Sequence, residues 1–124
     1  MVMFSFELSK LGKFLVLALV PLIFACGNNG APEVQAEPDG TFDEVLIDGR
    51  QIWGVQCASC HGPKGQGGRG AKLNDGKIFS AYPEPEMMIA VIANGKGQGM
   101  PAFETKISYQ ETEAVIRYIR EVLN

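Results

Sequence analysis

The feature that most constrains the fold is a cluster of reactive side chains in residues 56–63, QCASCHGP. Two of the chain's three cysteines, Cys57 and Cys60, and its only histidine, His61, lie within five positions. Residues three apart on a helix are neighbours on one face. We therefore expect the chain to fold around a group that these three side chains bind together.

The pattern C-x-x-C-H in residues 57–61 is the attachment motif of c-type haem. Two thiols one helical turn apart can add to the two vinyl groups at one edge of a porphyrin, and the next imidazole then lies beneath the iron. We therefore predict one covalently bound haem c, with Cys57 and Cys60 as attachment residues and His61 as an axial iron ligand.

Three other uses of the cluster are weighed against haem. A zinc site needs further ligands, and Cys26 is the only other cysteine or histidine in the chain. A thioredoxin-like redox pair expects a βαβ setting, which the helical pattern of this chain lacks. A plain disulfide between Cys57 and Cys60 is the third alternative. Residues 65–70 formally match G-x-G-x-x-G, but no strand precedes them and no helix opens on them, so we discard a dinucleotide site.

The first 25 residues predict a signal peptide. Two lysines, Lys10 and Lys13, precede an apolar run of only 12 residues, 14–25, whereas a spanning helix needs about 20. The run ends in residues 23–26, IFAC, which resemble a bacterial lipoprotein signal and imply cleavage before Cys26 and a lipid on its thiol. The alternatives are an ordinary secretory signal with Cys26 incidental, or a retained short anchor. Either export route predicts a periplasmic location or the outer side of the cytoplasmic membrane.

The rest of the chain divides into a tether and a domain. Residues 26–40 are rich in Gly and Pro and predict a lipid-anchored flexible tether, which leaves residues 41–124 as the folded domain. The formal net charge is −3, and no basic run is present, so nucleic-acid binding is excluded as a function.

Three helices are expected in the domain. The spacing of Thr41 and Glu44 predicts a capping box at the start of a helix that reaches Cys57. Pro85 is expected to begin a short helix that ends at residues 94–95. Ser108 and Glu111 have the spacing of a second capping box, which begins the last helix. Glycine-rich loops, 62–70 and 95–103, separate the helices, and no segment alternates with period two. We therefore expect an all-α domain with three or more helices and long ordered loops.

Met100 is the best candidate for the second axial ligand. Methionine commonly lies opposite histidine on c-type iron and raises its reduction potential. Met87 and Met88 lie on an expected helix, where methionine usually fills the core. Met100 instead lies in GMPAF, residues 99–103, where glycine allows close approach and proline stiffens the exit.

These motifs resemble those of small bacterial class I cytochromes c. Gly49 and Trp53 resemble the small-x-x-x-aromatic pattern of that family's first helix, and Tyr118 resembles the aromatic residue of its last helix. The resemblance implies a tight crossing of the two helices at Gly49. The family usually has Gly-Pro-x-Leu after the attachment loop, where the proline carbonyl accepts a hydrogen bond from the ligand histidine; this chain has GAKL, residues 70–73, which leaves Ala71 to supply the carbonyl.

Other residues are expected near the haem from their places beside the ligands. The candidate wall residues, which ordinary core packing explains equally well, are Leu73, Ile78, Ile92 and Phe103. The candidate partners of a haem propionate, which are otherwise solvated surface, are Arg69, Lys72 and Tyr82.

The resemblance implies outer-sphere transfer of single electrons in a membrane-associated respiratory or photosynthetic chain. The expected donor is a quinol-oxidising complex or dehydrogenase, and the expected acceptor is a terminal oxidase or reaction centre. No catalytic acid, base or nucleophile is indicated, so the chain is expected not to be an enzyme. The alternative is a haem enzyme or gas sensor, in which Met100 is absent from the iron or displaced from it.

Overall fold

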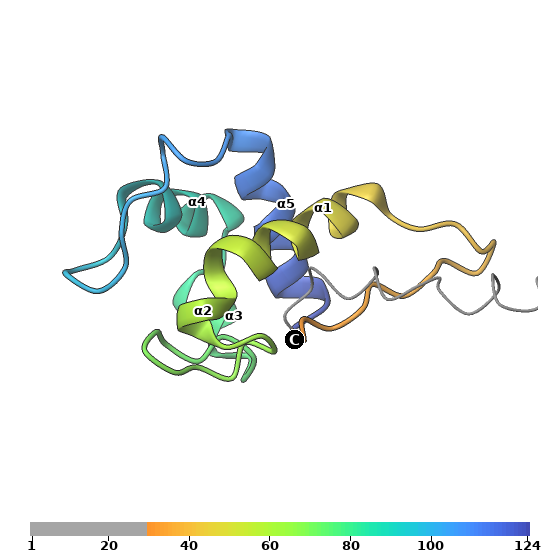
Figure 1. Ribbon diagram of the computed structural model, residues 1–124, viewed down its shortest axis with the longest axis horizontal. Helices are drawn as coiled ribbons and strands as arrows, with labels where there is room; N and C mark the ends of the chain where they lie inside the picture. The colour runs from red at the N-terminus through yellow and green to blue at the C-terminus, as the bar shows by residue number, and fades with distance from the viewer. Residues whose placement is uncertain (1–29) are drawn as a thin grey trace, which may run out of the picture.

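The computed structural model describes residues 30–124 and shows a helical domain (Figure 1). Within these residues no named strand forms, and the only bridge is the isolated pair Lys96 and Met100. No helix in this part of the chain is long and apolar enough to cross a membrane. Cys26 and the expected signal peptide lie outside the described residues. The helices, in chain order, are α1 (Glu44–Ile52), the π-helix η1 (Trp53–Cys57), α2 (Ala58–His61), α3 (Lys77–Ala81), α4 (Pro85–Asn94) and α5 (Tyr109–Glu121).

The expected crossing of the first and last helices is confirmed, and it is the centre of the fold. A Cβ built on Gly49 of α1 would overlap the carbonyl oxygen of Ala114 and lie 2.9 Å from the Cβ of Tyr118, both on α5. Only glycine lets the two backbones approach this closely. Trp53 and Tyr118 are fully buried beside the crossing, with ring centroids 6.4 Å apart.

The beginning of α1 differs from the prediction. Asp43, and not Thr41, is the N-cap: its Oδ1 accepts hydrogen bonds from the amides of Val45 at 2.9 Å and Leu46 at 3.2 Å. The Thr41 hydroxyl donates instead to Asp39 Oδ1, at 2.7 Å. A carboxylate at the N-cap also meets the positive end of the helix dipole.

The expected capping box of the last helix is confirmed. The Ser108 hydroxyl accepts from the Glu111 amide at 3.2 Å, and the Glu111 carboxylate accepts from the Ser108 amide at 2.7 Å. The apolar side of this helix faces the core, and Val122, just beyond the helix, is half-buried. The buried residues of α5 are Thr112, Ala114, Val115, Ile116, Tyr118 and Ile119.

The first helix does not run regularly to Cys57 as predicted. Its last five residues, Trp53–Cys57, form a π-helix, in which the Ala58 amide reaches the Trp53 carbonyl five residues back. π-Helical turns are rare and frequently lie at functional sites. The wider turn lies between the crossing with α5 and α2, and it ends at Cys57, the first of the two clustered cysteines.

The middle of the domain was predicted in part. Pro85 begins α4 and Gly95, with φ 74°, ends it, as the sequence indicates. The short helix α3 was not predicted, because it follows Gly76 directly and carries no capping side chain. Its buried residue is Ile78.

Residues 31–34 do not behave as the flexible tether that composition predicts. Ala31 and Val34 are each only 5 % exposed and belong to the hydrophobic core. The buried Arg50 side chain donates to the carbonyls of Ala31 at 3.0 Å and Pro32 at 2.8 Å, and also pairs with Glu33. Packed structure therefore begins about ten residues ahead of the expected boundary at residue 41, because a buried arginine binds this backbone.

Candidate functional site

The three clustered side chains lie where the first helix ends. Cys57 ends η1, Cys60 and His61 lie on α2, and all three are half-buried. Both thiols are free. Burial, with a smaller contribution from nearby Cys60, raises the pKa of Cys57 to about 12, so this thiol is protonated at neutral pH.

The orientation of His61 is fixed by the carbonyl that the sequence indicates. His61 Nδ1 lies 2.7 Å from the carbonyl oxygen of Ala71. Because a carbonyl only accepts, Nδ1 carries the hydrogen, and the Nε2 lone pair is left for a metal ion. The expected role of Ala71 is therefore confirmed as a hydrogen-bond acceptor, even though alanine replaces the usual proline.

Gly70 explains how this carbonyl comes so close. A Cβ at residue 70 would lie 2.9 Å from both Cε1 and Nδ1 of His61, closer than real Cβ atoms are found. The Gly70 amide also donates to the Cys60 carbonyl at 2.8 Å, and the Gly67 amide donates to the His61 carbonyl at 2.7 Å. The glycine-rich loop is thus an ordered cradle that folds back over α2.

Trp53 supports the imidazole from the core side. Its ring is fully buried, with its centroid 6.1 Å from that of His61. Its indole Nε1 donates to the Pro63 carbonyl at 2.9 Å. One side chain therefore links the α1–α5 crossing, the histidine and the first residues of the loop.

Met100 lies on a second ordered loop. Lys96 and Met100 exchange backbone hydrogen bonds of 3.0 and 3.3 Å, and the Phe103 amide donates to the Ile92 carbonyl at 3.0 Å, which ties the loop to α4. The Met100 side chain is half-buried and packs against the hydrophobic core. Its thioether is thus held on the core side of this loop.

The other expected neighbours of the haem separate into two groups. Of the four wall candidates, Leu73 is half-buried and three are buried, namely Ile78, Ile92 and Phe103. Of the propionate candidates, Arg69 and Lys72 are exposed, and Tyr82 is half-buried.

Lys96 is a neighbour of this region that the sequence reasoning missed. Its ammonium lies 2.6 Å from the Tyr82 hydroxyl, and the two residues come from different parts of the chain. The only sequence signal is a cation in the loop that carries the candidate methionine.

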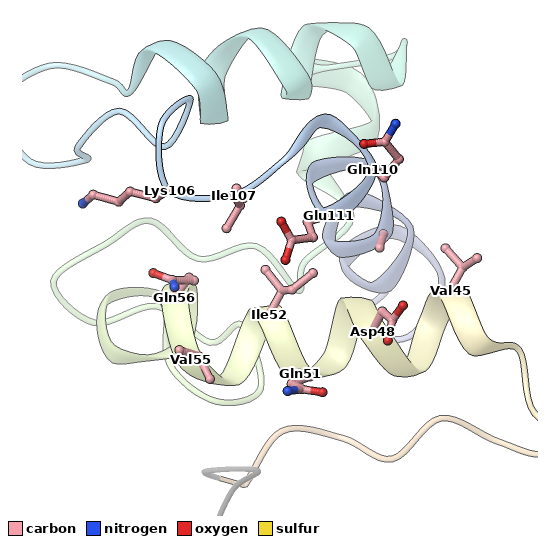
Figure 2. Close-up of a pocket in the computed structure, with 11 residues that line it drawn as sticks. Val45, Asp48, Gln51, Ile52, Val55, Gln56, Lys106, Ile107, Gln110 and Glu111 are labelled. Atoms are coloured by element: carbon pink, nitrogen blue, oxygen red, sulfur yellow. The ribbon is translucent and has the colours of Figure 1, made fainter.

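A groove of about 490 Å³ lies on another surface (Figure 2). Ile52 and Gln56 line it from the first helix, and Lys106 and Ile107 line it from the segment before α5. None of the four expected haem-binding residues contributes to its lining. This groove is therefore distinct from the site.

Comparison with known families identifies the domain. Residues 45–119 match the family model described as "Cytochrome C oxidase, cbb3-type, subunit III". The match covers more than half of the chain, including both expected ligand loops and the α1–α5 crossing. The chain belongs to the class I cytochrome c family.

Individual relatives agree with this membership. The chain is similar to a cytochrome c6-like protein of Nostoc sp., with 32 % identity over 88 % of this chain and 92 % of that protein. It is also similar to cytochrome c-551 of Bacillus subtilis, with 29 % identity over 72 % of this chain and 78 % of that protein. The crystal structure of cytochrome cL from Hyphomicrobium denitrificans shares the fold, with a TM-score of 0.56 and 23 % identity over 61 % of this chain and less than half (46 %) of that one.

The all-α fold expected from the sequence is confirmed, and so is the cofactor class: a cytochrome c of this family binds covalent haem c with its iron. The local chemistry fits one such group. Two free thiols lie three residues apart, and the adjacent imidazole keeps Nε2 available because Nδ1 is engaged by Ala71. A thioether sulfur is held on the second loop.

Proposed function

We propose that this chain carries single electrons between redox proteins, with Cys57 and Cys60 bonded to the haem and His61 and Met100 as its axial ligands. The observation that carries the proposal is the hydrogen bond from His61 Nδ1 to the Ala71 carbonyl, because it presents Nε2 as a ligand directly beside two free thiols. Each attachment would add the S–H group of one cysteine across a vinyl group of the haem, with the sulfur atom joined to one vinyl carbon and the hydrogen atom to the other, so that no leaving group is needed.

The haem supplies an iron that changes between the ferric and ferrous states. Backbone contacts of the domain would hold the two proposed ligands in place. The Ala71 carbonyl orients the imidazole and raises its basicity. The bridge between Lys96 and Met100 holds the thioether loop closed. With His61 and Met100 both bound to it, the iron would have no free coordination site for a substrate, which supports electron transfer over catalysis.

The proposed partners follow from the same family. The description of the matching model refers to a cytochrome c oxidase, which supports a terminal oxidase as one acceptor. A reaction centre is the other acceptor class, and a quinol-oxidising complex or dehydrogenase is the proposed donor. We further propose that the chain is exported, cleaved before Cys26 and lipid-anchored there, on the outer side of the cytoplasmic membrane.

The ligand assignment is tested by Met100→Ala in the haem-loaded protein. Loss of the thioether is expected to remove the methionine-to-iron absorption of the ferric form, lower the reduction potential and open the reduced iron to carbon monoxide. The matched control is Met87→Ala on α4, where the side chain is 44 % exposed. Rapid carbon monoxide binding by the unsubstituted protein would contradict the carrier function and support the haem enzyme or gas sensor instead.

The attachment and the anchor have separate tests. Cys57→Ala and Cys60→Ala together should release the haem under denaturing conditions, whereas Ser59→Ala between them should not. Cys26→Ala should release the protein from cell membranes. Continued tight membrane association of that variant would contradict the lipid anchor and leave the haem assignment untouched.

A further inference from the structure

The loop between α2 and α3, with the first residue of α3, carries an excess of positive charge. Residues 62–77, the basic loop, hold four basic residues and one acidic residue, a net charge of +3 in a chain whose net charge is −3. The acidic residue, Asp75, pairs with Lys77 at 3.1 Å. Within residues 30–124 no ion pair engages the other three basic residues, and all of them are exposed, namely Lys64, Arg69 and Lys72.

The basic loop is folded, so these charges have fixed places. The Leu73 amide donates to the Gly65 carbonyl at 2.8 Å, and the Asn74 side chain donates to the Lys64 carbonyl at 2.8 Å. Asn124 then donates to the Leu73 carbonyl at 2.9 Å and accepts from the Gly76 amide at 2.9 Å. The loop therefore presents one ordered cationic surface.

The N-terminal segment enters the domain beside this surface. A Cβ on Gly30 would lie 3.6 Å from the Cβ of Pro63, the second residue of the basic loop. Arg50 binds the carbonyls of Ala31 and Pro32, and the Tyr118 hydroxyl also donates to Pro32, at 2.7 Å. Figure 1 shows the start of this segment at the same lower edge as the loop after α2, whereas the loop that precedes α5 lies at the top.

The docked segment limits how far the domain extends from an anchor at Cys26. Only five residue steps separate Cys26 from Ala31. A fully extended chain covers about 3.5 Å per residue, so this edge of the domain stays within about 17 Å of the anchored residue. The fifteen-residue tether expected from the sequence would have allowed about 50 Å.

We propose that the basic loop binds the anionic headgroups of the membrane and so holds the domain in one orientation, with the loop before α5 facing away. The position of the membrane in this proposal rests on the lipid anchor at Cys26. The affinity rests on the charges alone, because each lysine or arginine near an anionic surface contributes about fivefold to binding. An acidic protein partner is the competing occupant, and the entry of the chain at this edge favours the membrane.

The test uses haem-loaded full-length protein carrying Cys26→Ala, so that no lipid contributes to binding. Its partition onto vesicles with about 30 % phosphatidylglycerol is compared with that onto neutral phosphatidylcholine vesicles at low salt. We expect preference for the anionic vesicles, lost at high salt because screening shortens the reach of each charge. Adding Lys64→Gln and Lys72→Gln should weaken this binding about 25-fold, and haem absorbance confirms that the variant is loaded.

The control is Lys106→Gln, which removes one lysine charge from an exposed site in the loop before α5. It should change vesicle binding by less than about twofold, since the segment before α5 lies at the edge of the domain opposite the basic loop (Figure 1). Equal binding to neutral and anionic vesicles, or equal losses in the two variants, would overturn the proposal. So would intact vesicle binding with slower electron exchange with an acidic redox protein, which would assign the surface to a protein partner. If the native protein carries no lipid at Cys26, the lipid anchor is contradicted, but the charge-dependent binding of the basic loop to vesicles is not.

Discussion

The Nδ1 atom of His61 lies 2.7 Å from the carbonyl oxygen of Ala71, and Gly70 is the residue that allows this approach. The hydrogen bond makes the imidazole a stronger donor of electrons to a metal, which favours the oxidised state. Alanine in place of the usual proline therefore preserves the contact, because the backbone supplies the acceptor and the neighbouring glycine supplies the space.

Gly70→Ala should disturb this contact without replacing either proposed ligand. The added methyl would lie 2.9 Å from the imidazole, so the ring must move and its hydrogen bond weakens. We expect less haem-loaded protein and a higher reduction potential in the fraction that loads, measured by redox titration. Gly99→Ala is the matched control, because a Cβ there meets no atom within 4 Å. Equal potentials in the two variants would show that the Ala71 contact does not tune the iron.

The helix crossing gives a prediction about stability alone. Gly49→Ala would force a methyl group into the Ala114 carbonyl of α5, and backbone cannot move aside as a side chain can. We expect the free energy of unfolding to fall by about 3 kcal/mol, the upper end of the usual cost of overpacking. Denaturant titration of the haem-loaded protein measures it. Gln51→Ala, at an exposed position of the same helix, should change stability by less than about 0.5 kcal/mol.

The parts of the fold that the sequence predicted are those where one local pattern has one physical meaning. Ser108 and Glu111 each accept a hydrogen bond from the other's backbone amide, which is a local pattern that begins a helix. Pro85 and Gly95 likewise mark the beginning and the end of α4. Gly49 was informative because a glycine inside an apolar helix face needs a reason. The C-x-x-C-H motif was recognised because haem attachment needs those residues at that spacing, whereas the Ala71 carbonyl was expected only from the resemblance to the family's Gly-Pro-x-Leu.

The remaining features depend on contacts between distant residues. Thr41 has the spacing of a capping residue, but its hydroxyl donates a hydrogen bond to Asp39, and Asp43 is the N-cap of α1 instead. Ala31 and Val34 lie in the core in a segment whose Ala31 and Pro32 carbonyls are bound by Arg50, and no local pattern encodes this contact. The π-helical turn at Trp53–Cys57 was not predicted either, because no local pattern in its five residues distinguishes a π-helical from an α-helical turn.

The contact between Asp43 and Arg117 predicts how the free energy of unfolding changes in acid. The Arg117 side chain donates to Asp43 Oδ2 at 2.9 Å, and together with the amides of Leu46 and Val45 it holds the pKa of Asp43 below its ordinary value. A carboxyl group whose folded pKa is lowered stabilises the fold above its unfolded pKa, near 4, and loses that contribution as the pH falls through the folded pKa.

Asp43→Asn should isolate this effect, because asparagine also caps helices and only the charge is removed. The variant should be less stable than the unsubstituted protein at neutral pH, and the two unfolding free energies should converge as the pH falls through the lowered folded pKa of Asp43. Chemical denaturation between these limits measures the difference. Glu104→Gln, which removes an exposed carboxylate without an ion pair among residues 30–124, should give no such convergence.

Arg50 predicts that the N-terminal segment is part of the folded unit. Its side chain is only 10 % exposed and binds two backbone carbonyls, and burial raises the pKa of Tyr118 to about 12, which keeps that hydroxyl protonated as a donor to Pro32. Arg50→Ala should lower the free energy of unfolding by about 2 to 3 kcal/mol, because charge-assisted hydrogen bonds and buried packing are both lost. Tyr118→Phe removes one neutral hydrogen bond and should cost about 1 kcal/mol.

Hydrogen exchange separates this local effect from general destabilisation. In the unsubstituted protein the amides around Val34 should be protected, and Arg50→Ala should release them at denaturant concentrations where α5 stays protected. Lys106→Ala, at an exposed cation away from the segment, should leave both regions unchanged. Rapid exchange around Val34 in the unsubstituted protein would mean that residues 31–34 form a tether after all, and the limit on the distance from Cys26 would then no longer hold.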